Sequence, residues 1–485
     1  MRVSLPRSTP SAQGVDAAGL RDFVVALENE GLAPHSFMLA RHGQVVAEGW
    51  WHPYAADRPA LVYSLSKTVT ATAVGLLVDE GRLSLDAPVL EFFPEIDRGE
   101  VAPLWGEVLV KHCLSMTVGH EVDAWQEVAR RGRSTWSGAP GSEAVAGDDG
   151  VRHVFATTPT ARPGTLFTYN QVATYLLSRI VARVTGSGVV DVLKGRLLSD
   201  LGVDDIPWDR DPQGHELGFS GAHLTTEAIL TLAQLYLGGG VLGDRRVLSK
   251  QWCDEATTRF GPTDLRPGVN PDWARGYGFS FWMQQVGYRG DGAYGQFLVV
   301  LPEHDVALAV TSEHENMQAT LDLVWRHLLP AFDRSGSSAA DAELVELLAA
   351  RRIEPLTDGS AAGEDVSLER ASGSDLSRRY TGASVRRDGS SWVLDLRRDE
   401  QVMAVRVGSG EWAASTLRSD GYELPVVASG GWRDADTFVA DVIVIETPHR
   451  FHVEGRRSTG EVGLRWRLMP LNGPDPLDLA VRRSD

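Results

Sequence analysis

Hydrophobic positions along the chain follow two different periods, and the order in which these periods occur predicts the elements of the fold. Apolar residues are spaced as on a helix through 15–30, and 35–51 reads as two strands on either side of the turn Arg41-His42-Gly43. The middle of the chain is mainly helical in pattern, with the clearest runs at 68–78, 170–186 and 223–240. Strand patterns return before a last helical run, at 276–285, 295–302 and 306–313.

This order predicts an α/β fold of the α+β type. Strand segments at both ends of residues 1–332 enclose a helical middle, so we expect one antiparallel sheet built from both ends. Helices should flank the sheet, and an all-helical subdomain should be inserted between its two halves. The Gly- and Ser-rich segment 130–150 has no period, and we interpret it as a mobile loop. Two roles stay open for it: a lid that gates the pocket, or only an insertion.

A second pattern begins after residue 332. Residues 333–374 have the composition of a linker, with one short helix predicted at 341–351. Residues 375–485 consist of short strands separated by turn pairs such as Asp388-Gly389. The sequence therefore predicts three parts: a main domain (1–332), a linker (333–374) and a small C-terminal β-barrel or sandwich (375–485).

Composition and charge narrow the possible partners. The 485 residues carry a formal net charge of −18, which argues against nucleic acid and anionic membranes as ligands. No run of 18 apolar residues and no apolar signal segment is present, so a cytoplasmic protein is expected. Cys113 and Cys253 are far apart and in no metal-binding spacing, and we predict buried free thiols. The oligomeric state stays open.

A serine and a lysine stand three residues apart where the run 68–78 begins. Ser64 and Lys67 should lie on one face of the first helical turn, so the amine can reach the hydroxyl. The positive end of the helix dipole and burial under an apolar helix both disfavour a charged lysine. A neutral amine can act as a base, and a serine beside a base is an activated nucleophile. The structural alternative is a capping serine beside a surface lysine.

Two further segments could complete a site. Tyr169 follows the turn Pro163-Gly164 and precedes the helix at 170–186, where a phenol close to Lys67 could ionise or relay a proton. The segment 288–296, YRGDGAYGQ, has three glycines at the start of a strand, which would let its backbone approach a ligand closely. Each has a simpler interpretation. Tyr169 could be a half-buried aromatic residue, and the segment 288–296 could be a tight hairpin turn.

Together these motifs resemble the serine β-lactamase and penicillin-binding-protein superfamily, and most closely the class C β-lactamases and their esterase relatives. Ser64-Leu65-Ser66-Lys67 matches the S-x-x-K box. Tyr169-Asn170-Gln171 falls where the family has Y-x-N, and Gly290-Asp291-Gly292 falls where it has K-T-G or H-x-G. The resemblance covers about residues 10–332, and the last 110 residues resemble, more weakly, the lipocalin-like β-domain of some members.

The resemblance implies a role for each matching residue. Ser64 would be the acylated nucleophile, Lys67 and Tyr169 would share the work of general base and acid, and the N–H groups of Ser64 and Ala293 would form the oxyanion hole. The substrate would contact the remaining matches, namely Gln171, Gly290, Asp291 and Gly292. Two departures stand out: Gln171 replaces an asparagine, and Gly290 replaces the lysine that helps to hold a substrate carboxylate.

The sequence therefore predicts a serine hydrolase that acts through an acyl-enzyme on a small ester or amide. A carboxylesterase is the first choice, because ester cleavage depends least on the missing lysine. A β-lactamase or a D-amino-acid amidase of the same family is the nearest alternative, and a non-catalytic sensor that keeps the fold is an alternative from another class. No cofactor is expected. Gly119-His120-Glu121 and Glu313-His314-Glu315 lack a partner at ligand spacing, so no metal site is predicted.

Overall fold

A computed structural model describes residues 5–99, 101–131, 150–261, 270–357, 359, 364–371, 380–398, 401–419 and 421–482. The chain divides into two compact units. The first holds the described residues up to 350 except 50–60, and the second holds 50–60 and the described residues from 351 onward. Most of the segment 130–150, which the sequence predicts to be a mobile loop, lies outside the described residues.

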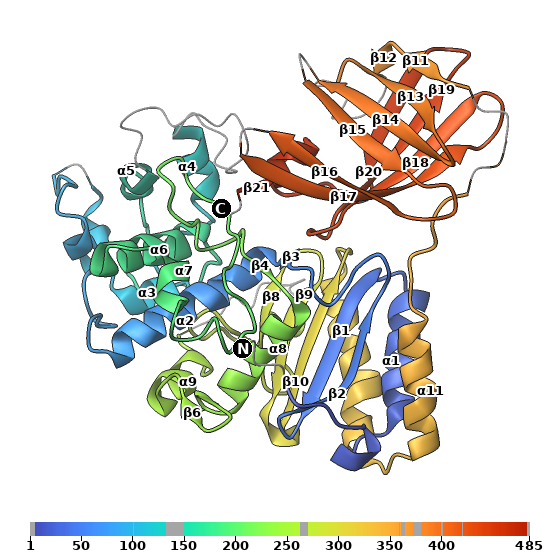
Figure 1. The fold of residues 1–485 in the computed structure, drawn as a ribbon. Coiled ribbons are helices and arrows are strands. Elements are labelled where there is room, and N and C mark those ends of the chain that lie inside the picture. The colour runs from blue at the N-terminus through green and yellow to red at the C-terminus, as the bar shows by residue number, and fades with distance from the viewer. Residues whose placement is uncertain are drawn as a thin grey trace. The chain divides into compact units, whose positions relative to one another are not determined.

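The first unit is built on one six-stranded sheet that uses both ends of its sequence (Figure 1). Its strand order is β2 (Gln44–Trp50), β1 (Pro34–Arg41), β10 (Val306–Ser312), β9 (Gln296–Leu301), β8 (Tyr288–Gly292) and β7 (Trp282–Met283). β1 pairs antiparallel with β10, with Phe37 opposite Val310. The predicted sheet made from both ends of the main domain is therefore confirmed.

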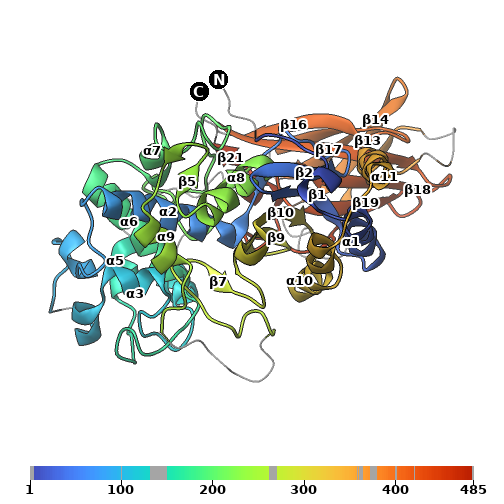
Figure 2. The same ribbon diagram turned by 90° about the horizontal axis from the view of Figure 1, so that it is seen from below.

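Helices cover both faces of this sheet. Phe23 of α1 (Ala17–Asn29) lies with its ring centroid 5.6 Å from that of Phe37 in β1, whereas Thr226 of α8 (Thr226–Leu237) donates a hydrogen bond to the neighbouring Ser36. Because successive strand residues point to opposite faces, α1 and α8 cover opposite faces. Figure 2 shows α10 (Met317–Leu323) next to α1.

The helical subdomain is centred on α2 (Ser66–Asp79). All residues of α2 from Ser66 to Leu77 are buried, as expected for a helix that is apolar on every side. α2 packs against α6 (Gln171–Thr185) and α7 (Val189–Leu193), and α3 (Val110–Leu114) packs against α6. A Cβ atom on Gly75 would lie 2.4 Å from the indole of Trp252, so this glycine is required by close packing.

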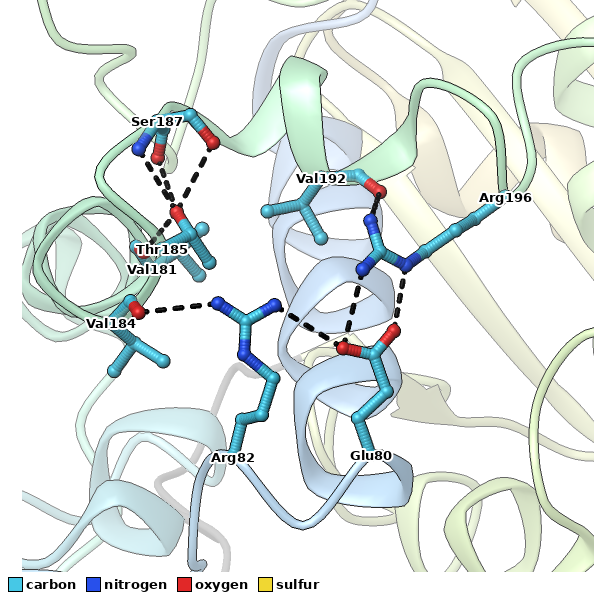
Figure 3. Close-up of polar contacts among 8 residues, drawn as sticks. All are labelled: Glu80, Arg82, Val181, Val184, Thr185, Ser187, Val192 and Arg196. Carbon is cyan, nitrogen blue, oxygen red and sulfur yellow. Dashed lines mark hydrogen bonds and ion pairs between the residues drawn. The ribbon is translucent and has the colours of Figure 1, made fainter.

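Surface ion pairs fix the C-terminal end of α2 (Figure 3). Glu80 accepts hydrogen bonds from Arg196 at 2.7 and 3.2 Å and from Arg82 at 3.3 Å, and Arg82 also donates to the carbonyl of Val184. The hydrogen bond from Arg196 is the main reason that the pKa of Glu80 is lowered. Because these side chains are partly exposed, the pairs orient the helix end and contribute little stability.

The second unit is strand-rich, as predicted for the C-terminal part of the chain. One sheet has the order β11 (Val366–Leu368), β13 (Gly382–Asp388), β14 (Ser391–Arg398) and β15 (Gln401–Val407). A second sheet contains β12 (Arg370–Ala371), β20 (Glu461–Trp466), β19 (Arg450–Arg456), β18 (Thr437–Val444), β17 (Tyr422–Trp432) and β16 (Ala413–Ser419), and β21 (Val481–Arg482) pairs with β17. The aromatic core of this second unit includes Trp392, Trp432 and Phe438.

The segment predicted as a linker, 333–374, contains a helix that belongs to the first unit. α11 (Ser338–Ala349) contacts α1, as Figure 1 shows, and its Asp341 accepts hydrogen bonds from Ser11. The division between the units falls at Ala350. The helix therefore lies within three residues of the predicted 341–351. It packs against α1 as part of the first unit, whereas a helix in a linker would make no such contact.

Both cysteines are buried free thiols, as predicted, and burial raises the pKa of Cys113 and of Cys253 to about 12. Within the part of the chain that the structure describes, no helix is both long and apolar enough to cross a bilayer.

Candidate active site

Ser64 lies on a tight turn that the sequence did not predict. It occupies the 3₁₀ turn η2 (Tyr63–Leu65), directly before α2 begins, and therefore stands just outside the helix in which the sequence places it. Tyr63 holds a positive φ of 46°, a conformation that is unfavourable for a bulky residue. Its buried ring packs against Tyr294 at 5.3 Å between centroids, and this packing holds the turn in place.

Lys67 is buried beside Ser64, as the sequence predicts. Its side chain starts in the first turn of α2 and is only 1% exposed. The Nζ atom lies 3.0 Å from Ser64 Oγ and donates a hydrogen bond of 2.9 Å to the carbonyl oxygen of Phe219. Burial lowers the pKa of Lys67 to about 7, although the charges of Asp123 and Asp291 act in the opposite direction.

These contacts suit an uncharged amine. A neutral lysine has one lone pair and two N–H groups, so it can accept the hydrogen of Ser64 Oγ and still donate to Phe219. The carbonyl of Phe219 thereby fixes the direction of the lone pair. This segment, 218–222, is itself tied to α2, since Thr70 donates to the carbonyl of Gly218 and Ser66 accepts from the N–H of Ala222.

The pH dependence of activity follows from this ionisation. We expect kcat/KM to rise with pH along an acid limb with a midpoint near 7, because Lys67 can accept the Ser64 proton only when its amine is uncharged and its pKa is about 7. Steady-state kinetics with an uncharged ester, from about pH 5 to about pH 9, measures this limb. A profile that is flat across neutrality would contradict the assignment of Lys67 as the base.

Tyr169 lies beside both groups. It is the second-last residue before α6, whose N-terminus is capped by the side chain of Asn170. The Tyr169 ring centroid lies 4.7 Å from Lys67 Nζ, and the Tyr169 hydroxyl is hydrogen-bonded to Ser64. Burial raises the pKa of Tyr169 well above its usual value. The phenol therefore stays protonated in the resting protein, which suits proton relay and not the ionised form that the sequence also allowed.

The glycines of the triplet 290–292 allow β8 to lie directly against the Ser64 turn. A Cβ on Gly290 would lie 2.6 Å from atoms of Leu65 and Thr68, and a Cβ on Gly292 would lie 2.0 Å from the carbonyl oxygen of Val62. A side chain at Gly290 would therefore be directed into the α2 packing. Ala293 directly follows Gly292, and its N–H is the predicted second oxyanion donor.

Asp291, between these glycines, forms a buried ion pair with Arg289, which directly precedes them. Arg289 is fully buried, and its Nε donates a 2.9 Å hydrogen bond to Asp291. Because successive strand residues point to opposite faces, Arg289 and Asp291 share the face of β8 opposite to that of Gly290. Burial raises the pKa of Asp291, and Arg289 opposes that effect.

Gln171 and Asp123 lie at the start of α6. The Gln171 N–H donates a 3.0 Å hydrogen bond to Asp123, and Gln171 Oε1 is buried with no hydrogen-bond partner among the described residues. Among the described residues, no hydrogen bond joins Gln171 to Lys67, whose amine contacts Ser64 and Phe219 instead. Asp123 and Phe219 were missed from the sequence, because one lies on a patternless loop and the other acts through its backbone.

The two histidine motifs that the sequence set aside have structural partners. His120 bonds to Thr157 at 2.9 Å and to the side-chain amide of Asn170 at 3.1 Å, which helps to hold the residue next to Tyr169. His314 bonds to Thr320 at 3.1 Å. No group of three or more histidine, cysteine or acidic residues that could hold a metal is found among the described residues.

Comparison with solved structures identifies relatives of this fold. A putative 6-aminohexanoate-dimer hydrolase from Bacillus anthracis matches with a TM-score of 0.53 and 19% identity, over 67% of this chain and 86% of that one. EstCE1, a hydrolase with promiscuous acyltransferase activity, matches with a TM-score of 0.52 and 16% identity, over 63% of this chain and 97% of that one. At these identities the likeness extends to the fold alone.

Sequence comparison gives the family. The chain is 29% identical over 295 residues to the 6-aminohexanoate-dimer hydrolase of Paenarthrobacter ureafaciens, a match that covers 57% of this chain and 72% of that protein. The model of the Beta-lactamase family matches residues 23–329, which is more than half of the chain. The chain, with its serine turn, buried lysine and sheet built from both ends, thus belongs to the Beta-lactamase family of hydrolases.

Proposed function

We propose that this protein is a serine hydrolase that forms an acyl-enzyme on Ser64, and that its substrates are carboxylic esters. The observation that carries this proposal is the 3.0 Å contact between Ser64 Oγ and the Nζ of a lysine that is only 1% exposed. A buried amine with a pKa of about 7 is uncharged in about half of the protein molecules at neutral pH. It can therefore accept a proton from the hydroxyl that it touches.

In the acylation step, Lys67 takes the proton of Ser64 Oγ while Oγ bonds to the carbonyl carbon of the ester. The N–H groups of Ser64 and Ala293 stabilise the oxyanion, and each such donor is worth about 3 kcal/mol. The bond to the leaving alcohol then breaks, and that oxygen receives a proton from Tyr169, which Lys67 replenishes. In deacylation a water loses its proton to the same groups and attacks the acyl carbon. The acyl bond to Ser64 breaks, and Oγ regains its proton.

The charge of the site favours esters that carry no carboxylate next to the reacting carbonyl. Gly290 stands in place of a lysine, and a side chain there would run into Leu65 and Thr68. The nearby Arg289 is fully buried and is already bound to Asp291. Neither position therefore offers a free cation for a substrate carboxylate, which weighs against β-lactams and for simple esters.

Amide cleavage is the second candidate. The relative that is 29% identical is named as the hydrolase of the 6-aminohexanoate dimer, and the proposed acylation chemistry also serves an amide when the leaving nitrogen is protonated. The fold alone does not separate the two activities, because one family scaffold hosts several substrates.

A substrate panel separates these candidates. We expect p-nitrophenyl acetate and butyrate to give a kcat/KM at least about tenfold higher than nitrocefin or a D-alanyl anilide, each corrected for the rate of Ser64→Ala. Faster turnover of the anilide would assign the protein as an amidase. A single covalent adduct without turnover would instead indicate a sensor and would overturn the hydrolase proposal.

A further inference from the structure

Asp291 occupies an unusual position for a carboxylate. It stands in the middle of the glycine triplet of β8, and it is only 8% exposed. Two donors bind it: the Nε of Arg289, at 2.9 Å, and the indole N–H of Trp282. A buried carboxylate that is bound on two sides has a fixed place, and here that place is within electrostatic reach of Lys67.

Arg289 is itself held tightly. Its guanidinium carbon lies 4.0 Å from the ring centroid of Trp273, and its Nη1 donates to the carbonyl of Asp272 at 3.3 Å. The Asp272 side chain accepts a 2.6 Å hydrogen bond from the N–H of Gln285. The cation beneath Asp291 therefore has little freedom to follow a movement of the carboxylate.

Trp282 connects Asp291 to the reacting groups. Its ring is stacked on Tyr169, with centroids 5.4 Å apart and planes 21° apart, and it meets Tyr277 edge-to-face at 4.7 Å. The hydroxyl of Tyr169 is hydrogen-bonded to Ser64. A continuous series of contacts thus runs from Arg289 through Asp291, Trp282 and Tyr169 to the nucleophile.

The charge of Asp291 also reaches Lys67 directly. Two carboxylates act on the Lys67 amine: Asp123, from the loop before α4 (Trp125–Arg131), and Asp291, from β8. Tyr169 faces the amine from the loop before α6, and Ser64 faces it from η2. The groups facing Asp291, apart from Lys67, are Arg289, Trp282, Tyr169 and Tyr277.

We propose that Asp291 is a positioning residue with two effects: it anchors the indole that orients the Tyr169 phenol, and it holds a negative charge near the Lys67 amine. It does not touch the substrate in this account. The proposal rests on the proposed function only in that Ser64 is the nucleophile, and it is independent of whether the substrate is an ester or an amide.

The test uses the rate at which a fluorophosphonate probe labels Ser64, measured against pH in the full-length protein. Removal of the charge in Asp291→Asn should move the midpoint of the labelling curve to lower pH by about one pH unit, because Lys67 then binds its proton less tightly. Trp282→Phe keeps an aromatic ring, although a smaller one, and lacks the N–H. It should slow labelling severalfold while leaving the midpoint in place. Asp254→Asn, which breaks a surface pair with Lys250, is the matched control and should change neither quantity.

Asp291→Asn leaves Arg289 unpaired and could fail to fold, so the double variant Arg289→Gln/Asp291→Asn is measured beside it. This variant contains no unpaired buried charge. Its midpoint should also move to lower pH, but by less than that of Asp291→Asn, because the opposing positive charge of Arg289 is removed as well. A folded variant of either kind with the wild-type midpoint would overturn the proposal and make the ion pair purely structural. If the wild type labels on Ser64 but cleaves no ester, the proposed function fails while this test still stands.

Discussion

Replacement of Ser64 by alanine is expected to abolish ester turnover, with a loss of about 10⁴-fold or more in kcat/KM. The hydroxyl of Ser64 lies 3.0 Å from the buried Lys67 amine and is hydrogen-bonded to Tyr169, so the substitution removes the group on which both side chains act. Because Ser64 is partly exposed and bears no structural hydrogen bond to the backbone of another element among the described residues, its removal should leave the fold intact. Hydrolysis of p-nitrophenyl butyrate, with thermal unfolding as a check, measures the loss.

Ser84→Ala is the matched control, since among the described residues the Ser84 hydroxyl takes part in one hydrogen bond, which it accepts from the exposed Asp86 N–H. It should retain the wild-type rate. A folded Ser64→Ala protein with the rate of this control would show that another residue is the nucleophile.

Replacement of Lys67 by methionine should lower kcat/KM by about 10³-fold, mainly through kcat. Methionine has a similar length and fits a buried apolar position, whereas it cannot accept the Ser64 proton. The substitution removes an amine whose burial already lowers its pKa to about 7, so the free energy of unfolding should fall little or should rise. Kinetics with the same ester and a thermal melt give both quantities.

Lys111→Met provides the comparison, because Lys111 pairs with Asp86 at a partly exposed site away from the Ser64 contacts. Full activity is expected for it. If Lys67→Met were as active as Lys111→Met, general base catalysis by Lys67 would be excluded. If Lys67→Met were inactive but unfolded, the result would instead report on packing, and the thermal melt separates the two cases.

Much of the fold follows from local patterns. The helix at 170–186 has both its N-cap, Asn170, and its terminating Gly186 in the sequence, and α6 runs from Gln171 to Thr185. The two halves of the sheet could be paired because strands stand at both ends of a helical middle. Ser64 and Lys67 could be placed together because three residues separate them along the chain, a spacing that local geometry turns into contact.

Other features depend on contacts between distant segments, and no local pattern encodes these. The strand predicted at 276–285 is reduced to Trp282–Met283, since Gly276 and Ser280 adopt positive φ angles of 136° and 61° that interrupt an extended run. The sequence predicts only short strands from residue 375 onward, whereas β17 runs for eleven residues through Pro425 and the pair Gly430-Gly431, which interrupt a strand pattern. The roles of Phe219 and Trp282 arise from a carbonyl and an indole that tertiary packing brings to the site.

The same distinction applies to charge. The sequence indicates that Gly290 lacks the family's lysine, whereas only the three-dimensional arrangement shows that a side chain there would meet Leu65 and Thr68. It also shows that Arg289 is paired with Asp291 and fully buried. Residue type thus predicted the absence of a cation, and packing supplies the physical reason.

The most direct test of the account is to trap the covalent intermediate. Wild-type protein is mixed with p-nitrophenyl butyrate, quenched in acid within the first turnover, and analysed by intact mass and peptide mapping. We predict one butyryl group, carried by the peptide that contains Ser64. A butyryl group on any other residue would contradict the account. So would a burst of p-nitrophenolate that leaves no trapped adduct on the protein.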